Sequence, residues 1–278
     1  MTFPFRLAAV DLDDTLLGPD KAISRANADA VHALRARGVT VTLASGRRHA
    51  NMLRFHRQLG LGADDLIVSC NGALVQTAET SRVLHERRVP HELAREILAD
   101  GAERGLTQNY YHPDGAVYVS ARTPFTALYE GRTQSDVRVH DDFLDLPASD
   151  ETAPLKIIWV TGAALVADLF PVFETRYEGR LYVTVTDPEY LEFMAPGVNK
   201  AEGVSVAAGA LGLSARDVLA FGDGNNDVPL LAWAGLGIAM SNARDGAKAV
   251  AARVAPPGDP ETSFARAVTQ LLGENTPG

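Results

Sequence analysis

Two clusters of carboxylates each follow a short apolar run, and their composition suits the binding of a hard cation. Asp11, Asp13 and Asp14 come directly after an apolar run near the N-terminus. Asp223 and Asp227 lie four positions apart, just after a second apolar run. Like charges this close together are costly unless a cation or protons neutralise them. Oxygen ligands without histidine or cysteine favour magnesium, which proteins hold with a few carboxylates, water and substrate phosphate.

Neither cluster is specific by itself. An aspartate-rich turn after a strand more often serves to cap a helix. The segment 222–227, Gly-Asp-Gly-Asn-Asn-Asp, could be an ordinary polar loop or part of a calcium site. It lacks the ligand order and the late bidentate glutamate of a calcium loop. The two clusters together, each at the end of an apolar run, favour a magnesium site over either alternative.

The elements that must position these acids alternate between strand and helix patterns. Three apolar runs predict buried parallel strands: 7–10, 39–44 and 66–68. Between the first two runs, residues 24–37 have a helical pattern, with Ser24 as the N-cap and Gly38 at the position after the C-cap. The alternation resumes near residue 195. Helices are predicted at 200–211 and 228–234, and strands at 218–221 and 237–239.

This alternation indicates a parallel sheet that is covered by helices on both faces. In an open sheet of this kind, ligands bind beyond the carboxyl ends of the strands. Polar side chains that directly follow a strand can therefore converge on one site despite their separation in sequence. Four such residues are Asp11, Ser45, Asn71 and Asp223.

The middle of the chain has a different pattern, with several predicted strands that follow one another without an intervening helix. The predicted strands are 83–89, 107–111, 116–120, 155–160, 181–185 and 190–194, and the predicted helices are 92–103 and 163–177. This order favours an antiparallel sheet with helices on one side. We therefore predict an α/β protein: a Rossmann-like parallel-sheet core formed by residues 1–82 and 195–278, with an inserted α+β domain at 83–194.

Composition excludes several classes of partner. The chain has 278 residues, enough for two modest domains, and a formal net charge of −9. This charge repels nucleic-acid backbones and anionic membranes, so we expect neither as a partner. The single cysteine, Cys70, excludes an intrachain disulfide, and we see no signal peptide or membrane-length apolar stretch. We expect a soluble, cytoplasmic protein, and the sequence does not indicate its oligomeric state.

The motifs occur in the order that is typical of one family. Asp11–Thr15 resembles the Asp-x-Asp-x-Thr signature of the haloacid dehalogenase superfamily, and Ser45 matches its second motif. Lys200 and the segment 222–227 match the third and fourth motifs. The large insertion, together with Asn71-Gly72, resembles the Cof-type subfamily, in which an α/β cap domain is inserted into the core.

One residue departs from the family pattern. Asp14 occupies a position where glycine is common in this family. A short polar side chain tolerates unusual turn dihedrals, so we expect the turn to form all the same.

The resemblance implies a role for each acid. Asp11 would be the nucleophile that attacks phosphorus, and Asp13 would protonate the leaving alcohol and then activate water. Magnesium would be bound by Asp11, the backbone carbonyl of Asp13 and Asp223. Asn226 and Asp227 would contribute directly or through water, and the metal would offset the repulsion between an anionic nucleophile and an anionic phosphate.

The other motif residues would contact the substrate. The resemblance implies that the Ser45 hydroxyl and the Gly46 amide donate to phosphate oxygens, and that Lys200 supplies a positive charge. Asn71 and Gly72 would line the site. Two further residues would contact the substrate: Arg47 and Asn226.

These expectations lead to a hypothesis of function. The chain would be a magnesium-dependent phosphatase that hydrolyses a small phosphate monoester, such as a sugar phosphate, a nucleotide or a phosphorylated cofactor. A phosphomutase is the alternative within the same chemistry. A noncatalytic sensor of a phosphorylated ligand is the alternative from another class, although it predicts loss of the catalytic acids. A metal-free dehalogenase fits less well, because the second acid and the fourth motif suit magnesium.

Overall fold

A computed structural model of the protein describes residues 3–274. The contacts divide the chain into two units. The core unit comprises the residues up to Gly46, Met52–His85 and the residues from Asn199 onward. The inserted unit comprises Arg47–Asn51 and Glu86–Val198. The predicted domain boundaries, at 82/83 and 194/195, lie a few residues before the two main points where the chain passes from the core unit to the inserted unit and back.

The core unit is built on an eight-stranded sheet in the order β14-β13-β12-β1-β2-β3-β4-β5. Its strands are β1 (Leu7–Val10), β2 (Thr40–Ala44), β3 (Leu66–Ser69), β4 (Leu74–Thr77), β5 (Val83–Glu86), β12 (Val218–Gly222), β13 (Leu236–Ala239) and β14 (Arg253–Val254). The strands from β14 to β3 are parallel, as predicted, and β4 pairs with β3 in the antiparallel direction. Of the two strands that were not predicted, β14 lies at one edge of the sheet and β4 lies next to the other edge strand, β5. The strand predicted at 83–89 was wrongly assigned to the inserted domain, since β5 belongs to the core sheet.

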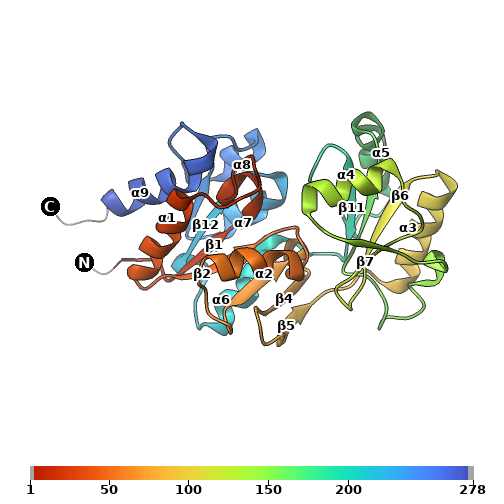
Figure 1. Ribbon diagram of the computed structural model, residues 1–278, viewed down its shortest axis with the longest axis horizontal. Helices are drawn as coiled ribbons and strands as arrows, with labels where there is room; N and C mark the ends of the chain where they lie inside the picture. Colours follow the sequence, from red (N-terminus) through yellow and green to blue (C-terminus); the bar gives the residue numbers. More distant parts are fainter. Residues whose placement is uncertain (1–2, 275–278) are drawn as a thin grey trace. The chain divides into compact units, whose positions relative to one another are not determined.

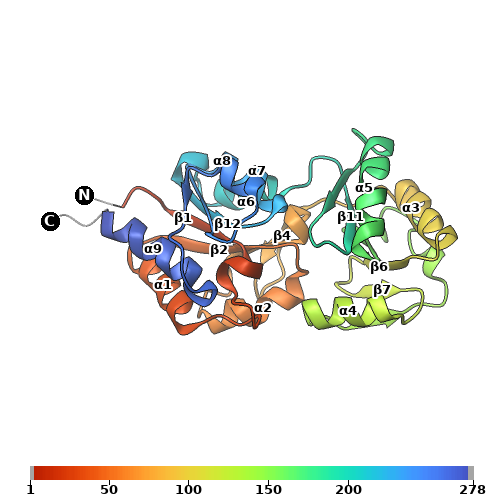
Figure 2. The same ribbon diagram turned by 90° about the horizontal axis from the view of Figure 1, so that it is seen from above.

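Helices cover both faces of the core sheet, which confirms the predicted architecture (Figures 1 and 2). The helices are α1 (Arg25–Ala36), α2 (His49–Gln58), α6 (Lys200–Ala210), α7 (Val228–Trp233), α8 (Asp245–Val250) and α9 (Ser263–Glu274). Helices α1 and α9 pack against each other on one face, and α6, α7 and α8 lie on the other. Because both faces are covered, β1, β3 and β12 are buried along their whole length.

Helix α1 shows how local sequence sets an element's ends. The Ser24 hydroxyl accepts a hydrogen bond from the backbone N–H of Asn27 at 3.2 Å, so the predicted N-cap is confirmed. Ala30, Val31 and Leu34 are the buried apolar residues of the helix. Gly38 has a φ of +78°, the left-handed conformation predicted for the residue after the C-cap.

The inserted unit is built on a six-stranded sheet in the order β10-β11-β9-β6-β7-β8. Its strands are β6 (Thr107–Tyr111), β7 (Val117–Val119), β8 (Val137–Val139), β9 (Lys156–Val160), β10 (Tyr182–Val185) and β11 (Tyr190–Met194). Its helices are α3 (His91–Glu103), α4 (Pro124–Thr133) and α5 (Ala163–Arg176). The sheet is antiparallel as predicted except for β7 and β8, which are parallel because the unpredicted helix α4 connects them.

The prediction that all helices lie on one side of this sheet is wrong. Adjacent strand residues point to opposite faces. Tyr110 packs in the apolar cluster that α3 and α5 cover, and Phe173 of α5 lies 4.7 Å from Trp159 between ring centroids. The hydroxyl of the next residue, Tyr111, hydrogen-bonds that of Tyr129 on α4 at 2.6 Å. Helix α4 therefore lies on the opposite face from α3 and α5.

The face that α4 covers holds a buried ion pair. The Lys156 ammonium on β9 donates to both carboxylate oxygens of Glu192 on β11, at 3.0 and 3.1 Å. The Thr186 hydroxyl donates to the same carboxylate at 2.8 Å. Both charged residues are about 2% exposed. A buried charge is tolerable only with a partner, so each residue requires the other.

No helix in the described part of the chain is long and apolar enough to span a membrane.

Replacing Glu192 with glutamine should strongly destabilise the inserted unit. The change leaves the Lys156 ammonium buried without a counter-charge, and breaking a buried pair in this way costs about 3–5 kcal/mol. The matched control is Glu96→Gln, which removes a partner from the exposed pair with Arg180 and should cost under about 1 kcal/mol. Urea denaturation can be followed by fluorescence in a Trp233→Phe background, which leaves Trp159 as the reporter. Equal midpoints for the two variants would contradict this assignment.

Candidate active site

The parallel register of the core sheet brings several polar residues to one edge. β1 lies between β2 and β12, with Val10 opposite Leu43 and Phe221. Asp11 therefore follows β1 at the level where Ser45 follows β2 and Asp223 follows β12. The backbone amide of Asp11 donates to the Phe221 carbonyl at 3.0 Å, which fixes the position of its Cα.

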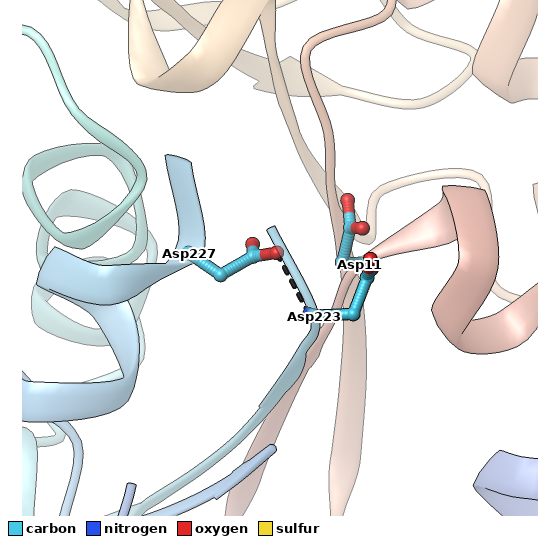
Figure 3. Close-up of side chains that lie close together, drawn as sticks. All are labelled: Asp11, Asp223 and Asp227. Atoms are coloured by element: carbon cyan, nitrogen blue, oxygen red, sulfur yellow. Dashed lines mark hydrogen bonds between the residues drawn. The ribbon is translucent and has the colours of Figure 1, made fainter. Parts of the chain in front are cut away.

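Three carboxylates from the two acidic clusters lie together at this edge. Each of Asp11, Asp223 and Asp227 has a carboxylate oxygen within 4.8 Å of the others (Figure 3). Asp11 is 5% exposed and Asp227 is fully buried. A set of oxygen donors this close together fits a hard divalent cation.

Lys200, the first residue of α6, balances part of this charge. Its ammonium group donates to Asp11 Oδ1 and to Asp227 Oδ1, both at 2.6 Å, and the side chain is fully buried. The remaining oxygen of Asp227, Oδ2, accepts from the backbone amides of Asp223 and Gly224 at 3.0 and 2.9 Å. Asp227 thus holds both the lysine and the loop that carries Asp223, and Figure 3 shows its hydrogen bond to Asp223.

Asp223 has a partner that the sequence did not indicate. The buried hydroxyl of Thr15 donates to Asp223 Oδ1 at 3.0 Å. A fixed donor of this kind orients a metal-ligating carboxylate.

The pKa values of the acids report the crowding of negative charge. Burial raises the pKa of Asp11 well above its usual range, and Asp227 and Asp223 raise it further against the opposing effect of Lys200. Burial, followed by the charge of Asp227, raises the pKa of Asp223 to about 7. Burial alone would lower the pKa of Lys200, but the carboxylates of Asp11 and Asp227 outweigh it and raise that pKa. A cation at this site would favour the ionised carboxylates.

Glycine at position 72 allows α6 to begin close to β3. A Cβ at Gly72 would lie 2.2 Å from the backbone carbonyl oxygen of Asn199, and a Cβ at Gly203 would lie 2.8 Å from the Cα of Gly72. Gly72 also has a φ of +99°. The side chain of Asn199 caps the helix by accepting from the Glu202 amide at 3.0 Å. The close packing of Gly72 against the backbone of Asn199 sets the position of the next residue, Lys200.

Asn71 connects the loop after β2 to the loop after β12. Its amide oxygen accepts from Asn226 Nδ2 at 2.9 Å, and its backbone amide donates to the Ser45 carbonyl at 3.0 Å. A Cβ at Gly46 would lie 3.0 Å from the same amide oxygen. Asn71 has a left-handed φ of 56°, which asparagine tolerates better than most residues. The structure thus brings these four predicted residues together.

Two predicted site residues have partners outside the group of three carboxylates. Within residues 3–274, the close group of carboxylates does not include Asp13. Asp13 Oδ1 instead lies 3.3 Å from the ammonium of Lys21. Arg47 belongs to the inserted unit, where it donates to the Thr133 carbonyl at 3.0 Å.

The turn that carries Asp13 forms despite the departure at position 14. Leu12–Leu16 form one π-helical turn in which Asp14 has φ 56° and ψ 9°. This is a left-handed conformation of the kind that glycine favours. The expectation that a short polar residue tolerates it is confirmed.

Comparison with known proteins identifies the family of the chain. A family model described as haloacid dehalogenase-like hydrolase matches residues 8–266. The HMP-PP phosphatase of Cronobacter sakazakii (strain ATCC BAA-894) is 28% identical over 239 residues, which cover 86% of this chain and 85% of that protein.

Solved structures show the same fold. A haloacid dehalogenase-like hydrolase from Bacteroides thetaiotaomicron is 26% identical with a TM-score of 0.84, covering 96% of this chain and 99% of that chain. The sugar phosphatase BT4131, described as HAD subclass IIB, is 20% identical with a TM-score of 0.82, covering 95% of this chain and 98% of that chain. The resemblance seen in the four motifs is confirmed, and the chain belongs to the haloacid dehalogenase-like hydrolases.

Proposed function

We propose that the protein is a magnesium-dependent phosphatase that hydrolyses small phosphate monoesters through an aspartyl-phosphate at Asp11. One observation carries the proposal: the buried Asp11 carboxylate contacts the Lys200 ammonium at 2.6 Å and lies in a close group with Asp223 and Asp227. Similarity to a protein named HMP-PP phosphatase supports it. The substrate that we propose is a small phosphorylated metabolite, such as a sugar phosphate, a nucleotide or a phosphorylated cofactor.

Asp11 is suited to be the nucleophile because its surroundings fix it in place. It directly follows the central strand β1, and it is held by Lys200. A carboxylate that attacks phosphorus divides one difficult displacement into two easier ones. The Lys200 ammonium places a positive charge where a phosphate dianion must approach.

The donor set fits magnesium. Asp11, Asp223 and the backbone carbonyl of Asp13 would hold the ion. Asp227 would contribute through water because both of its carboxylate oxygens already accept hydrogen bonds, and Asn226 would contribute directly or through water. The ion would supply positive charge that offsets the repulsion between two anionic reactants. Thr15 would keep Asp223 oriented toward it.

The loops after β2 and β3 would bind the substrate. The Ser45 hydroxyl and the Gly46 amide would donate to phosphate oxygens, next to Lys200. Asn71 would keep these groups in register with Asn226 through its hydrogen bonds to the Asn226 side chain and to the Ser45 carbonyl. Gly72 and Arg47 would also contact the substrate.

Asp13 would act as the general acid in the first step and as the general base in the second. The Asp11 carboxylate attacks phosphorus as the bond from phosphorus to the ester oxygen breaks, and the Asp13 carboxyl group gives its proton to that oxygen, so that a neutral alcohol leaves. The Asp13 carboxylate then takes a proton from water as the water oxygen attacks phosphorus. The bond from phosphorus to Asp11 breaks, its electron pair returns to the Asp11 carboxylate, and inorganic phosphate is released.

Replacing Asp11 with asparagine should abolish turnover. The change keeps the shape of the side chain but removes the nucleophile, so we expect kcat with p-nitrophenyl phosphate and Mg²⁺ to fall at least about 10³-fold. Asp29→Asn, an exposed change on α1, is the matched control and should leave kcat unaltered. Phosphate release that persists in Asp11→Asn would show that the nucleophile is another residue. Wild-type transfer of phosphate to a second hydroxyl, without release, would indicate a mutase.

Magnesium should stabilise the protein more at pH 8 than at pH 5.5. The pKa of Asp223 is raised to about 7, above its unfolded value of 3.8. Its protonation therefore stabilises the metal-free fold below about pH 4, and this stabilisation is lost as pH rises through about 7. Mg²⁺ competes with that proton, so its apparent affinity at pH 5.5 should be about 30-fold weaker than above pH 7. Thermal melts with and without Mg²⁺ test this, and an equal increase of Tm at both pH values would contradict it.

A further inference from the structure

A cluster of three charged residues lies in the loop between β1 and α1. The Lys21 ammonium is 3.3 Å from Asp13 Oδ1 and 3.3 Å from Asp14 Oδ1. Asp14 is the residue that stands where the family commonly has glycine. The three side chains are between 30% and 54% exposed. The proposed chemistry uses Asp13 and assigns no role to the other two.

The loop has a left-handed backbone conformation at Asp14 and at Lys21. Asp14 has a φ of 56° and Lys21 a φ of 59°, which are left-handed conformations that side chains with a Cβ rarely adopt. Backbone hydrogen bonds close the loop, from the Lys21 amide to the Gly18 carbonyl and from the Gly18 amide to the Ala22 carbonyl, both at 2.9 Å. The Asn242 side chain donates to the Asp14 carbonyl at 3.1 Å.

Stability alone does not account for this arrangement. Exposed ion pairs contribute little to folding, because solvent screens them and ordering the side chains costs entropy. A left-handed conformation costs at least as much free energy as an exposed ion pair contributes. Backbone strain that no stabilising interaction offsets is typical of functional positions.

The direction of Asp13 matters for the reaction. In an in-line displacement, the leaving oxygen lies on the side of phosphorus opposite to Asp11. A group that protonates this oxygen must therefore stand away from Asp11. Within residues 3–274, the carboxylates grouped with Asp11 are those of Asp223 and Asp227. Asp13 is held toward Lys21 instead.

We propose that Lys21, itself held by Asp14, is a positioning residue that keeps the Asp13 side chain directed at the leaving-group oxygen. This role rests on the proposed phosphatase activity. Lys21 acts through Asp13, whose carboxylate its ammonium contacts, and we assign it no contact with the substrate. Lys200 and Ser45 are the groups that meet the phosphate.

The test compares two substrates that differ in how much the leaving group needs a proton. Phenyl phosphate and p-nitrophenyl phosphate have similar shapes, but phenoxide is the stronger base and depends more on protonation as it leaves. The value of kcat/KM covers the steps up to this departure and excludes the later hydrolysis of the aspartyl-phosphate. The full-length protein is assayed with Mg²⁺.

The Lys21→Met variant keeps most of the side-chain volume and removes the charge. We expect the ratio of kcat/KM for phenyl phosphate to that for p-nitrophenyl phosphate to fall about tenfold, because misplacing a catalytic group costs rate where that group is needed. Lys21→Arg should restore the ratio to within about threefold of the wild type, since it keeps the charge. Lys248→Met, at a lysine on α8, is the matched control and should leave the ratio unchanged.

A second variant keeps the idea testable if Lys21→Met does not fold. Asp14→Asn retains a side chain that tolerates the left-handed turn and removes the charge that holds Lys21. It should lower the same ratio, by about threefold, because Lys21 still contacts Asp13.

Three results would overturn the positioning role. Equal losses with both substrates would mean that Lys21 acts on the phosphate or on the fold, and an unchanged ratio in Lys21→Met would mean that it has no part in leaving-group departure. An arginine variant that fails to recover the ratio would exclude a role for the charge. Absence of turnover by the wild type with either substrate would instead overturn the proposed function, and the role of Lys21 with it.

Discussion

The buried ammonium group of Lys200 is the constraint on which the rest of the site depends. A buried charge is expensive without partners, and this one meets two carboxylates, Asp11 and Asp227, which themselves are buried. Each of the three groups is therefore tolerable only in the presence of the others. Asp227 extends the dependence to the backbone of Asp223 and Gly224. The position of one lysine thus determines how the loop after β12 is folded and where the Asp11 carboxylate points.

That position is set by backbone packing more than by side chains. Helix α6 begins where Gly72 and Gly203 let two backbones approach, and no residue with a Cβ fits at Gly72 without moving the chain. The same segment contains Asn71, whose amide ties the loop after β2 to the loop after β12. The groups that we propose to bind phosphate and metal are therefore held by a single turn after β3. Such rigid support suits a site whose chemistry depends on placement.

The sequence predicted the acids of the site because strand ends are easy to locate. Apolar runs followed by Asp11 and Asp223 required only the period of a buried strand and the rule that ligands bind at its carboxyl end. The contact of Thr15 with Asp223 and the pairing of Lys21 with Asp13 could not be predicted, since they depend on turn geometry that composition does not encode. Helix α4 escaped prediction for a related reason: its buried side is a threonine and a tyrosine, Thr126 and Tyr129, and lacks an apolar stripe.

The position of β1 in the core sheet has a consequence for synthesis on the ribosome. Its two neighbours, β2 and β12, lie on opposite sides of the inserted unit in the chain. The inserted unit has an apolar cluster of its own and can form it as soon as residue 198 has emerged. Until β12 follows, β1 keeps an open edge whose unpaired backbone groups invite wrong partners. The nascent protein can therefore complete its inserted unit first, and the carboxylates of Asp11 and Asp223 can meet only after residue 223 has emerged.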